Sequence, residues 1–143
     1  MNPEVKEKWL HALRSGKYLQ ARKTLHLRAE DGTDFYCCLG VLCDVYNKSV
    51  PAEKQLEWVE DNEHALEVPA GAKRLGIRDL WLDKEKGRIQ SSVLPATVRK
   101  WAELGEQNPT PELKTGHSCG SLAELNDSGL DFKAIADLIE EGL

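Results

Sequence analysis

The sequence predicts a compact single domain of the α+β class, mostly helical with one or two small β-hairpins. Two observations favour this class. Apolar residues recur at helical spacing near both ends of the chain, and short apolar runs bounded by turn residues lie between them. A chain of 143 residues can bury roughly two-thirds of the surface that its unfolded form exposes. We therefore expect one domain over residues 1–143.

A first helix is predicted at the N-terminus. Asn2 can cap it, Pro3 suits the first helical position and Gly16 can end it. Four-residue spacing predicts that one face of this helix packs against the core. The apolar residues on that face are Val5, Trp9 and Leu13.

A β-hairpin is predicted next. Leu25 and Leu27 alternate with polar neighbours, Asp31-Gly32 supplies turn chemistry, and an apolar run starts at Phe35. The hairpin should therefore lead directly into the apolar segment that follows it.

That segment contains three of the four cysteines of the chain, between Tyr36 and Asp44. Val41, Leu42 and Val45 can share one helical face, so we expect a buried helix over about residues 38–46. The thiols would then lie near the helix N-terminus.

The middle of the chain predicts mixed short elements. Residues 56–59 and 65–68 resemble a second short hairpin around a polar turn, and a short helical piece is expected around residues 72–75. Residues 88–93 are expected to form a strand.

The last third of the chain predicts three helices. Pro95 can start the first and Gly105 can stop it. A short helix over residues 121–126 should end at Gly129, and Asp131 can cap the next. The apolar face of that last helix contains Phe132, Ile135, Ala136 and Ile139.

Charge and hydropathy exclude several classes of partner. The net charge is −5 and the pI is near 5.4, with both signs mixed along the chain, which argues against a nucleic acid polymer. No apolar run approaches the ~18 residues of a membrane span, and the N-terminus lacks the apolar stretch of a signal peptide. We therefore expect a cytoplasmic protein with no membrane partner, whose cysteines stay reduced.

The thiols allow three interpretations. As an enzyme, the protein could use Cys38 as a nucleophile at a helix start and His117 as its base, because Cys38 to Leu42 resembles the helix start of papain-like cell-wall peptidases. As a metal site, Cys38, Cys43, His117 and Cys119 have irregular spacing, so no metal is predicted. The third interpretation is that the cysteines pack the core as small apolar residues.

A ligand-binding site is the alternative to catalysis. Arginines near the thiol segment can meet an anionic ligand, carboxylates and an amide can bind ribose hydroxyls or base edges, and an aromatic ring can stack on a base. Helix capping explains Asn126 and Asp127 equally well without a ligand. The candidate ligand-binding residues are Arg22, Arg28, Asp44, Trp81, Asn126 and Asp127.

Three segments carry a resemblance to a known group of proteins. They are Tyr36–Asp44, Leu94–Trp101 and Leu122–Glu140, and in this order they resemble a family of small phage and prophage proteins. Small phage accessory proteins often counter host defences, and one strategy is to sequester a nucleotide signal without cleaving it.

The resemblance implies a counter-defence protein of the host cytoplasm that is not an enzyme and needs no cofactor. Its partner would be a small nucleotide-like ligand such as an ADP-ribose derivative or a cyclic dinucleotide. Two alternatives stay open: a papain-like thiol hydrolase that uses Cys38 and His117, and a protein-binding inhibitor of a host enzyme. The four tryptophans and three tyrosines can stack on bases or build the interface of a homo-oligomer.

Overall fold

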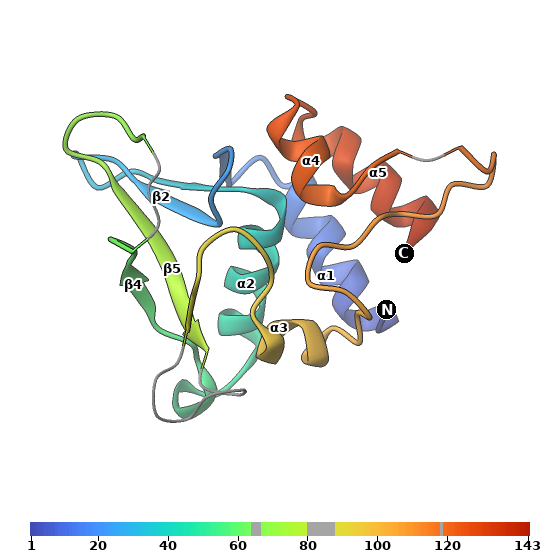
Figure 1. Ribbon diagram of the computed structural model, residues 1–143. Coiled ribbons are helices and arrows are strands. Elements are labelled where there is room, and N and C mark those ends of the chain that lie inside the picture. Colours follow the sequence, from blue (N-terminus) through green and yellow to red (C-terminus); the bar gives the residue numbers. More distant parts are fainter. Residues whose placement is uncertain (64–66, 80–87, 118) are drawn as a thin grey trace.

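A mixed β-sheet and a group of helices share one hydrophobic core (Figure 1). The computed structural model describes residues 1–63, 67–79, 88–117 and 119–143. In chain order, the elements are α1 (Pro3–Arg14), β1 (Leu19–Gln20), β2 (His26–Arg28), β3 (Asp34–Tyr36), α2 (Cys38–Ser49), the 3-10 turn η1 (Ala52–Lys54), β4 (Trp58–Glu60), β5 (Lys73–Asp79), β6 (Arg88–Gln90), α3 (Ala96–Trp101), α4 (Leu122–Asp127) and α5 (Phe132–Gly142).

The sheet has six strands, in the order β1-β3-β2-β5-β4, with β6 paired to β5 outside this path. Among the described strands, only β1 and β3 pair in parallel. Side chains of directly paired residues lie on the same face of a sheet. Leu19, Phe35 and Leu27 therefore share one face, which we call the outer face. His26 and Tyr36 share the other, inner face.

The α+β class is confirmed, but the expectation of a mostly helical chain was wrong. β5 pairs with β2, β4 and β6, so residues 73–75 are strand and not the expected helical piece. β4 pairs with β5, and residues 67 and 68 are not strand, so the second predicted hairpin was also wrong. Residues 64–66 of that hairpin lie outside the described residues. Pairing across the sheet, which local patterns do not report, decided this region.

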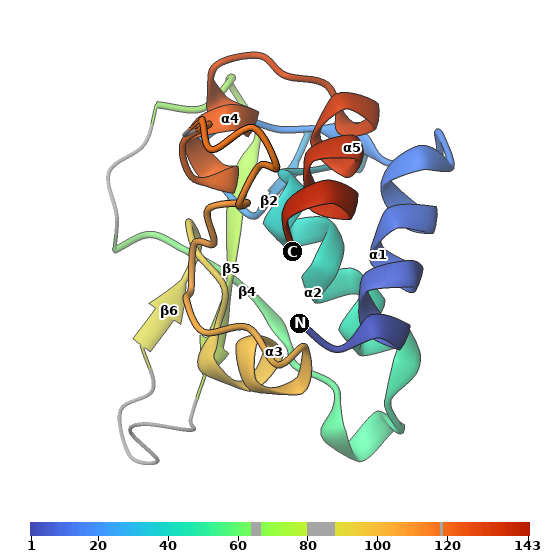
Figure 2. The ribbon, with the colours of Figure 1, turned by 90° about the vertical axis from the view of Figure 1, so that its right-hand side faces the viewer.

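The first helix is confirmed as predicted. The Asn2 side chain accepts hydrogen bonds from the backbone N–H groups of Glu4 and Val5, at 3.0 and 3.2 Å. The three apolar residues spaced by four are buried. Figure 2 shows α1 and α5 side by side, and Arg14 of α1 forms ion pairs with Asp137 and Glu140 of α5 at 2.8 and 2.7 Å.

Helix α2 is buried between the sheet and the other helices (Figures 1 and 2). The predicted helix over residues 38–46 is confirmed and continues to Ser49. The Sγ of Cys37 accepts the N–H of Gly40 at 3.4 Å, so a cysteine caps this helix. Gly40 packs so tightly on the backbone before β2 that a Cβ there would lie 1.9 Å from the carbonyl oxygen of Leu25.

The C-terminal helices are also confirmed. Ser121 and Glu124 form a capping box at the start of α4, and Asp131 caps α5 through the N–H of Ala134 at 2.8 Å. Helix α3 follows Pro95 as expected. None of the helices in the described part of the chain combines the length and apolar character that a membrane span requires.

A buried histidine lies on the inner face of the sheet. His26 is 1% exposed, stacks on Tyr36 at 4.3 Å and meets the edge of Trp58 at 4.7 Å. Its Nε2 lies 2.7 Å from Asp34, and its Nδ1 has no hydrogen-bond partner in the described structure. Burial lowers the pKa of His26 despite the neighbouring carboxylate, so the ring is neutral and Nε2–H donates to Asp34.

Replacing Gly40 by alanine should destabilise the fold by about 3 kcal/mol, because the new methyl group overlaps the Leu25 carbonyl. Gly105→Ala is the matched control, since a Cβ there meets nothing within 4 Å, and its effect should stay within about 0.5 kcal/mol. Urea denaturation followed by circular dichroism measures both values. Equal stability of the two variants would show that the α2–Leu25 contact is not tight.

The lowered pKa of His26 predicts a loss of stability at acid pH. Below about pH 6.5 the unfolded chain binds a proton at this residue and the folded chain resists it, so the free energy of unfolding should fall as pH decreases. His26→Gln can still donate to Asp34 but does not titrate. Denaturant unfolding at pH 7 and pH 5.5 should show a larger loss for the wild type than for this variant, and parallel losses would contradict the prediction.

Candidate ligand-binding site

The structure separates the predicted site residues into two groups. Arg22, Asn126 and Asp127 meet at a backbone corner after β1. Arg28 and Asp44 lie apart from this corner: Arg28 donates to Asp34 at 2.9 Å, whereas Asp44 bonds to Tyr18 and Lys48. The predicted stacking residue Trp81 falls outside the described residues.

Asn126 has a structural role in this arrangement. Its side chain is fully buried. Its Nδ2 donates to the Ala21 carbonyl at 2.8 Å, while its Oδ1 accepts the N–H of Cys38 at 3.1 Å and Nε2 of Gln20 at 2.9 Å. Nδ2 also donates to the Asp127 carboxylate at 3.4 Å, so the amide is fully used and Asn126 fixes the corner and α2 from inside the core.

The corner itself has an unusual backbone. Lys23 has a φ of 63°, in the left-handed region that is unfavourable for a residue with a Cβ. The Asp127 carboxylate accepts its N–H at 2.7 Å, which holds this conformation. Two contacts from α4, at Ala21 and Lys23, thus determine the path of the chain at Arg22.

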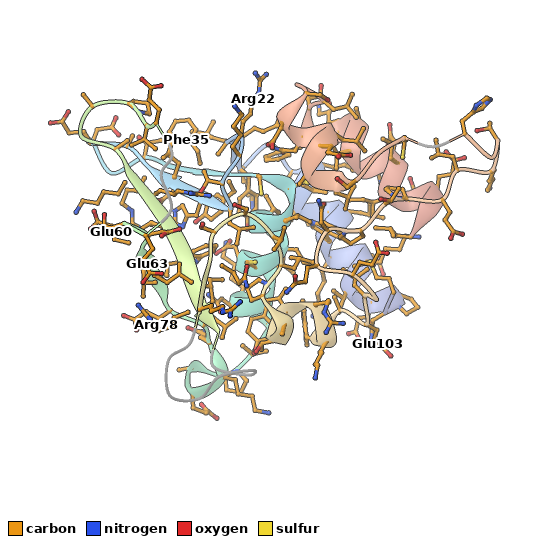
Figure 3. The ribbon with its side chains drawn as sticks, in the orientation of Figure 1. Arg22, Phe35, Glu60, Glu63, Arg78 and Glu103 are labelled. Atoms are coloured by element: carbon orange, nitrogen blue, oxygen red, sulfur yellow. The ribbon has the colours of Figure 1, made fainter. Side chains whose placement is uncertain are left out.

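Arg22 is the exposed cation that this corner presents. Figure 3 shows its guanidinium group projecting away from the ribbon. A Cβ at Gly129 would lie 3.3 Å from an Arg22 nitrogen, so the glycine lets the side chain run close to the turn between α4 and α5. No hydrogen bond or ion pair within the described structure engages the guanidinium group, which leaves it available to an anion.

A groove of about 950 Å³ begins beside Arg22 and runs over the outer face of the sheet. It adjoins a second hollow of about 540 Å³, since Arg22, Leu27 and Pro69 line both. We call the larger hollow the Arg22 groove. It is lined by Gln20, Ala21, Arg22, Leu27, Ala29, Glu30, Asp31, Phe35, Pro69, Ala70 and Ala72.

The Arg22 groove combines three kinds of surface. Leu27 and Phe35, paired across β2 and β3, give it an apolar floor. Glu30 and Asp31 add carboxylates at the hairpin turn, and hydrogen bonds from Thr33 lower the pKa of Asp31. An apolar floor with a few charged groups at its edges is typical of small-molecule sites.

Of these lining residues, sequence reasoning named only Arg22 as a site residue. Leu27 and Phe35 belong to the predicted hairpin, and its register would have put them side by side on one face. Glu30 and Asp31 lie at the predicted turn. No sequence signal indicates that residues 69–72 form the opposite wall, because this contact depends on the β4–β5 connection.

The proposed catalytic pair is not assembled in the structure. Cys38 is fully buried, and its thiol donates to the Leu122 carbonyl at 3.6 Å. Burial raises the pKa of Cys38 well above its usual value and that of Cys37 to about 12, which disfavours thiolate. His117 is exposed and, in the part of the chain described, makes no hydrogen bond with Cys38. These observations favour core packing.

A metal centre is not found either. Among the described residues, no group of three or more histidine, cysteine, aspartate or glutamate side chains is placed to hold an ion. The Cys43 thiol is buried in α2, and Cys119 donates to the Pro111 carbonyl at 3.6 Å. The prediction that the thiols and His117 bind no metal rests on their irregular spacing in the sequence.

Comparison with known proteins identifies the family of the chain. No curated protein and no solved structure matches it significantly. One family model, described as a domain of unknown function, DUF8296, matches residues 1–143. Because this match covers the whole sequence, the chain belongs to the DUF8296 family.

Proposed function

We propose that the protein is a phage-type accessory protein that binds a small nucleotide-derived immune signal in the Arg22 groove and sequesters it without cleavage. One observation carries the binding proposal: a single groove contains a free guanidinium group, an apolar floor with an aromatic ring, and a pair of carboxylates. The phage setting rests on the resemblance of three sequence segments, among them Tyr36–Asp44.

Arg22 supplies the contact for phosphate. Guanidinium groups bind phosphate oxygens through two parallel hydrogen bonds, which gives both affinity and orientation. The backbone corner that presents Arg22 is already fixed by Asn126 and Asp127, so little backbone ordering should accompany binding.

The apolar floor supplies the contact for a base. Stacking of an aromatic side chain on a nucleobase contributes about 1–3 kcal/mol and tolerates any base. Phe35 is half-buried on β3, and Leu27 lies beside it on β2, so both are held by the sheet. A planar ring can lie on this surface between Arg22 and the hairpin turn.

Glu30, Asp31 and Gln20 supply contacts for ribose hydroxyls. Ionised carboxylates accept hydrogen bonds and do not donate them, which matches the donor groups of a sugar. The same carboxylates repel a second phosphate, so they favour a ligand whose charge is concentrated at the Arg22 end. Mononucleotide and ADP-ribose derivatives fit this pattern better than a highly charged polyphosphate.

The lining of the groove supports binding without cleavage. No cysteine, serine or histidine is among the described residues that line the Arg22 groove. The buried thiols of α2 are core residues and lie outside that lining. A ligand held there would meet no thiol or hydroxyl nucleophile with a histidine base, and we assign the two carboxylates of the lining to the sugar hydroxyls.

The direct test is depletion followed by release. The purified protein is incubated separately with ADP-ribose, cyclic ADP-ribose and cyclic dinucleotides, filtered, and then heat-denatured, and the ligand is analysed by mass spectrometry. Intact ligand in the released fraction supports sequestration. Chemically altered ligand would make the protein an enzyme, and no depletion of any of these compounds would overturn the proposal.

Arg22→Ala should weaken binding of the depleted ligand by at least about tenfold, because one charge-assisted phosphate contact is lost. Isothermal titration calorimetry measures the affinity. Arg88→Ala is the matched control: Arg88 is also exposed but lies on β6, outside the lining of the groove. The control should retain wild-type affinity. Equal affinities of the two variants would remove Arg22 from the site.

The buried thiols of Cys37 and Cys38 should react slowly in the native protein. Burial disfavours the thiolates of Cys37 and Cys38, so iodoacetamide at neutral pH should label both far more slowly than the partly buried Cys119. Peptide mapping by mass spectrometry gives the rate at each site, with the urea-unfolded chain as the reference. Preferential labelling of Cys38 would instead support the thiol hydrolase.

A further inference from the structure

A cleft of about 450 Å³, separate from the two hollows at Arg22, lies between α1, α2 and strand β3. We call it the tyrosine cleft. Its lining includes Tyr36 from the inner face of the sheet, whereas the floor of the Arg22 groove lies on the outer face. The residues that carry its chemistry are Lys8, Lys17, Tyr18, Asp34, Tyr36, Asp44 and Lys48.

An ordered polar network forms one wall of this cleft. The Tyr18 hydroxyl donates to the Asp44 carboxylate, which also accepts from Lys48 Nζ at 2.8 Å. That ammonium lies 5.4 Å from the centre of the Tyr18 ring. The hydrogen bond with Asp44 raises the pKa of Lys48, so the ammonium group stays charged. Asp44 is therefore an oriented acceptor at the side of the cleft.

Tyr36 contributes a second aromatic ring and an unused hydroxyl. Its ring stacks on buried His26 and meets the edge of Tyr18 at 5.5 Å. These two neighbours fix the position of the ring. Its hydroxyl makes no hydrogen bond to any group in the described structure. Asp34, held by His26 and Arg28, lies on the same strand and also lines the cleft.

The rim of the cleft is cationic although the chain as a whole is acidic. Lys8 and Lys17 are exposed, and neither forms an ion pair with another described residue. His11 lies with them on the α1 side. Asp44 and Asp34 are already paired with Lys48 and Arg28, so the two free lysines leave the rim with a positive balance.

These groups define a ligand with two different ends. The free lysines match a phosphate, the carboxylates accept from hydroxyl groups, and tyrosine rings pack against the C–H faces of a sugar. A bare anion would meet the two carboxylates, and a ligand without charge would leave the lysines unused. We propose that the tyrosine cleft is a second binding site, independent of the Arg22 groove, for a small phosphorylated sugar.

The test uses ribose 5-phosphate, ribose and inorganic phosphate as probes of the full chain, followed by two-dimensional ¹H–¹⁵N NMR. Ribose 5-phosphate should shift the amide signals of Lys17 and Lys48, and it should shift them equally in Arg22→Ala, which alters only the other groove. Its affinity should exceed that of either fragment by at least about tenfold, since both ends contribute. Equal affinity for inorganic phosphate would overturn the sugar assignment, and no shifts at the cleft would overturn the site.

Tyr36→Phe is the sharpest variant because it removes only a hydroxyl that the fold does not use. It should keep the melting temperature and weaken ribose 5-phosphate binding about fivefold to tenfold. The double variant Lys8→Ala, Lys17→Ala should weaken ribose 5-phosphate binding further and reduce the salt dependence of that binding. Lys133→Ala, at an exposed position on α5, is the control and should change neither. Wild-type affinity in both cleft variants would overturn the proposal, while any ligand bound in the Arg22 groove should bind them normally.

Discussion

The buried amide of Asn126 connects the parts of the molecule on which both clefts depend. It accepts from the first turn of α2 and from Gln20, and it donates to the carbonyl of Ala21. Loss of the amide would leave a buried N–H and a buried C=O without partners, which costs more than the hydrogen bonds themselves contribute. One side chain of the C-terminal third thus bonds both to the backbone beside Arg22 and to the start of α2.

Helix α2 transmits this constraint to the rest of the fold. The close contact of Gly40 with Leu25 sets the distance between α2 and the β2–β3 hairpin, and the indole N–H of Trp9 donates to the Cys38 carbonyl at 3.0 Å. The cysteines fit here because a small, weakly polar side chain can pack where the backbones approach closely. The thiol segment therefore acts through packing, and its own chemistry is suppressed by burial.

One hairpin gives the protein two different surfaces. Alternation along β2 and β3 directs Leu27 and Phe35 to the outer face and His26 and Tyr36 to the inner face. The outer face combines an apolar floor with Arg22, whereas the inner face combines hydroxyl, carboxylate and lysine groups. The chain as a whole carries a net charge of −5, so the positive charge at Arg22 and at the lysines of the tyrosine cleft is confined to these two places. Apolar side chains surround Arg22, whereas hydroxyl and carboxylate groups surround the lysines.

The sequence by itself determined the elements whose signals are local. Asn2 and Asp131 are the caps that helix-start patterns predict, and the hairpin and α2 follow from alternation, turn residues and periodicity. Arg22 was predictable as a ligand-binding residue only from the charge of its side chain. Tertiary structure decided that β5 pairs with three strands, that Asn126 and Asp127 serve the backbone, and that residues 69–72 close a groove. These outcomes depend on contacts between distant residues, whose energies do not appear in any local pattern.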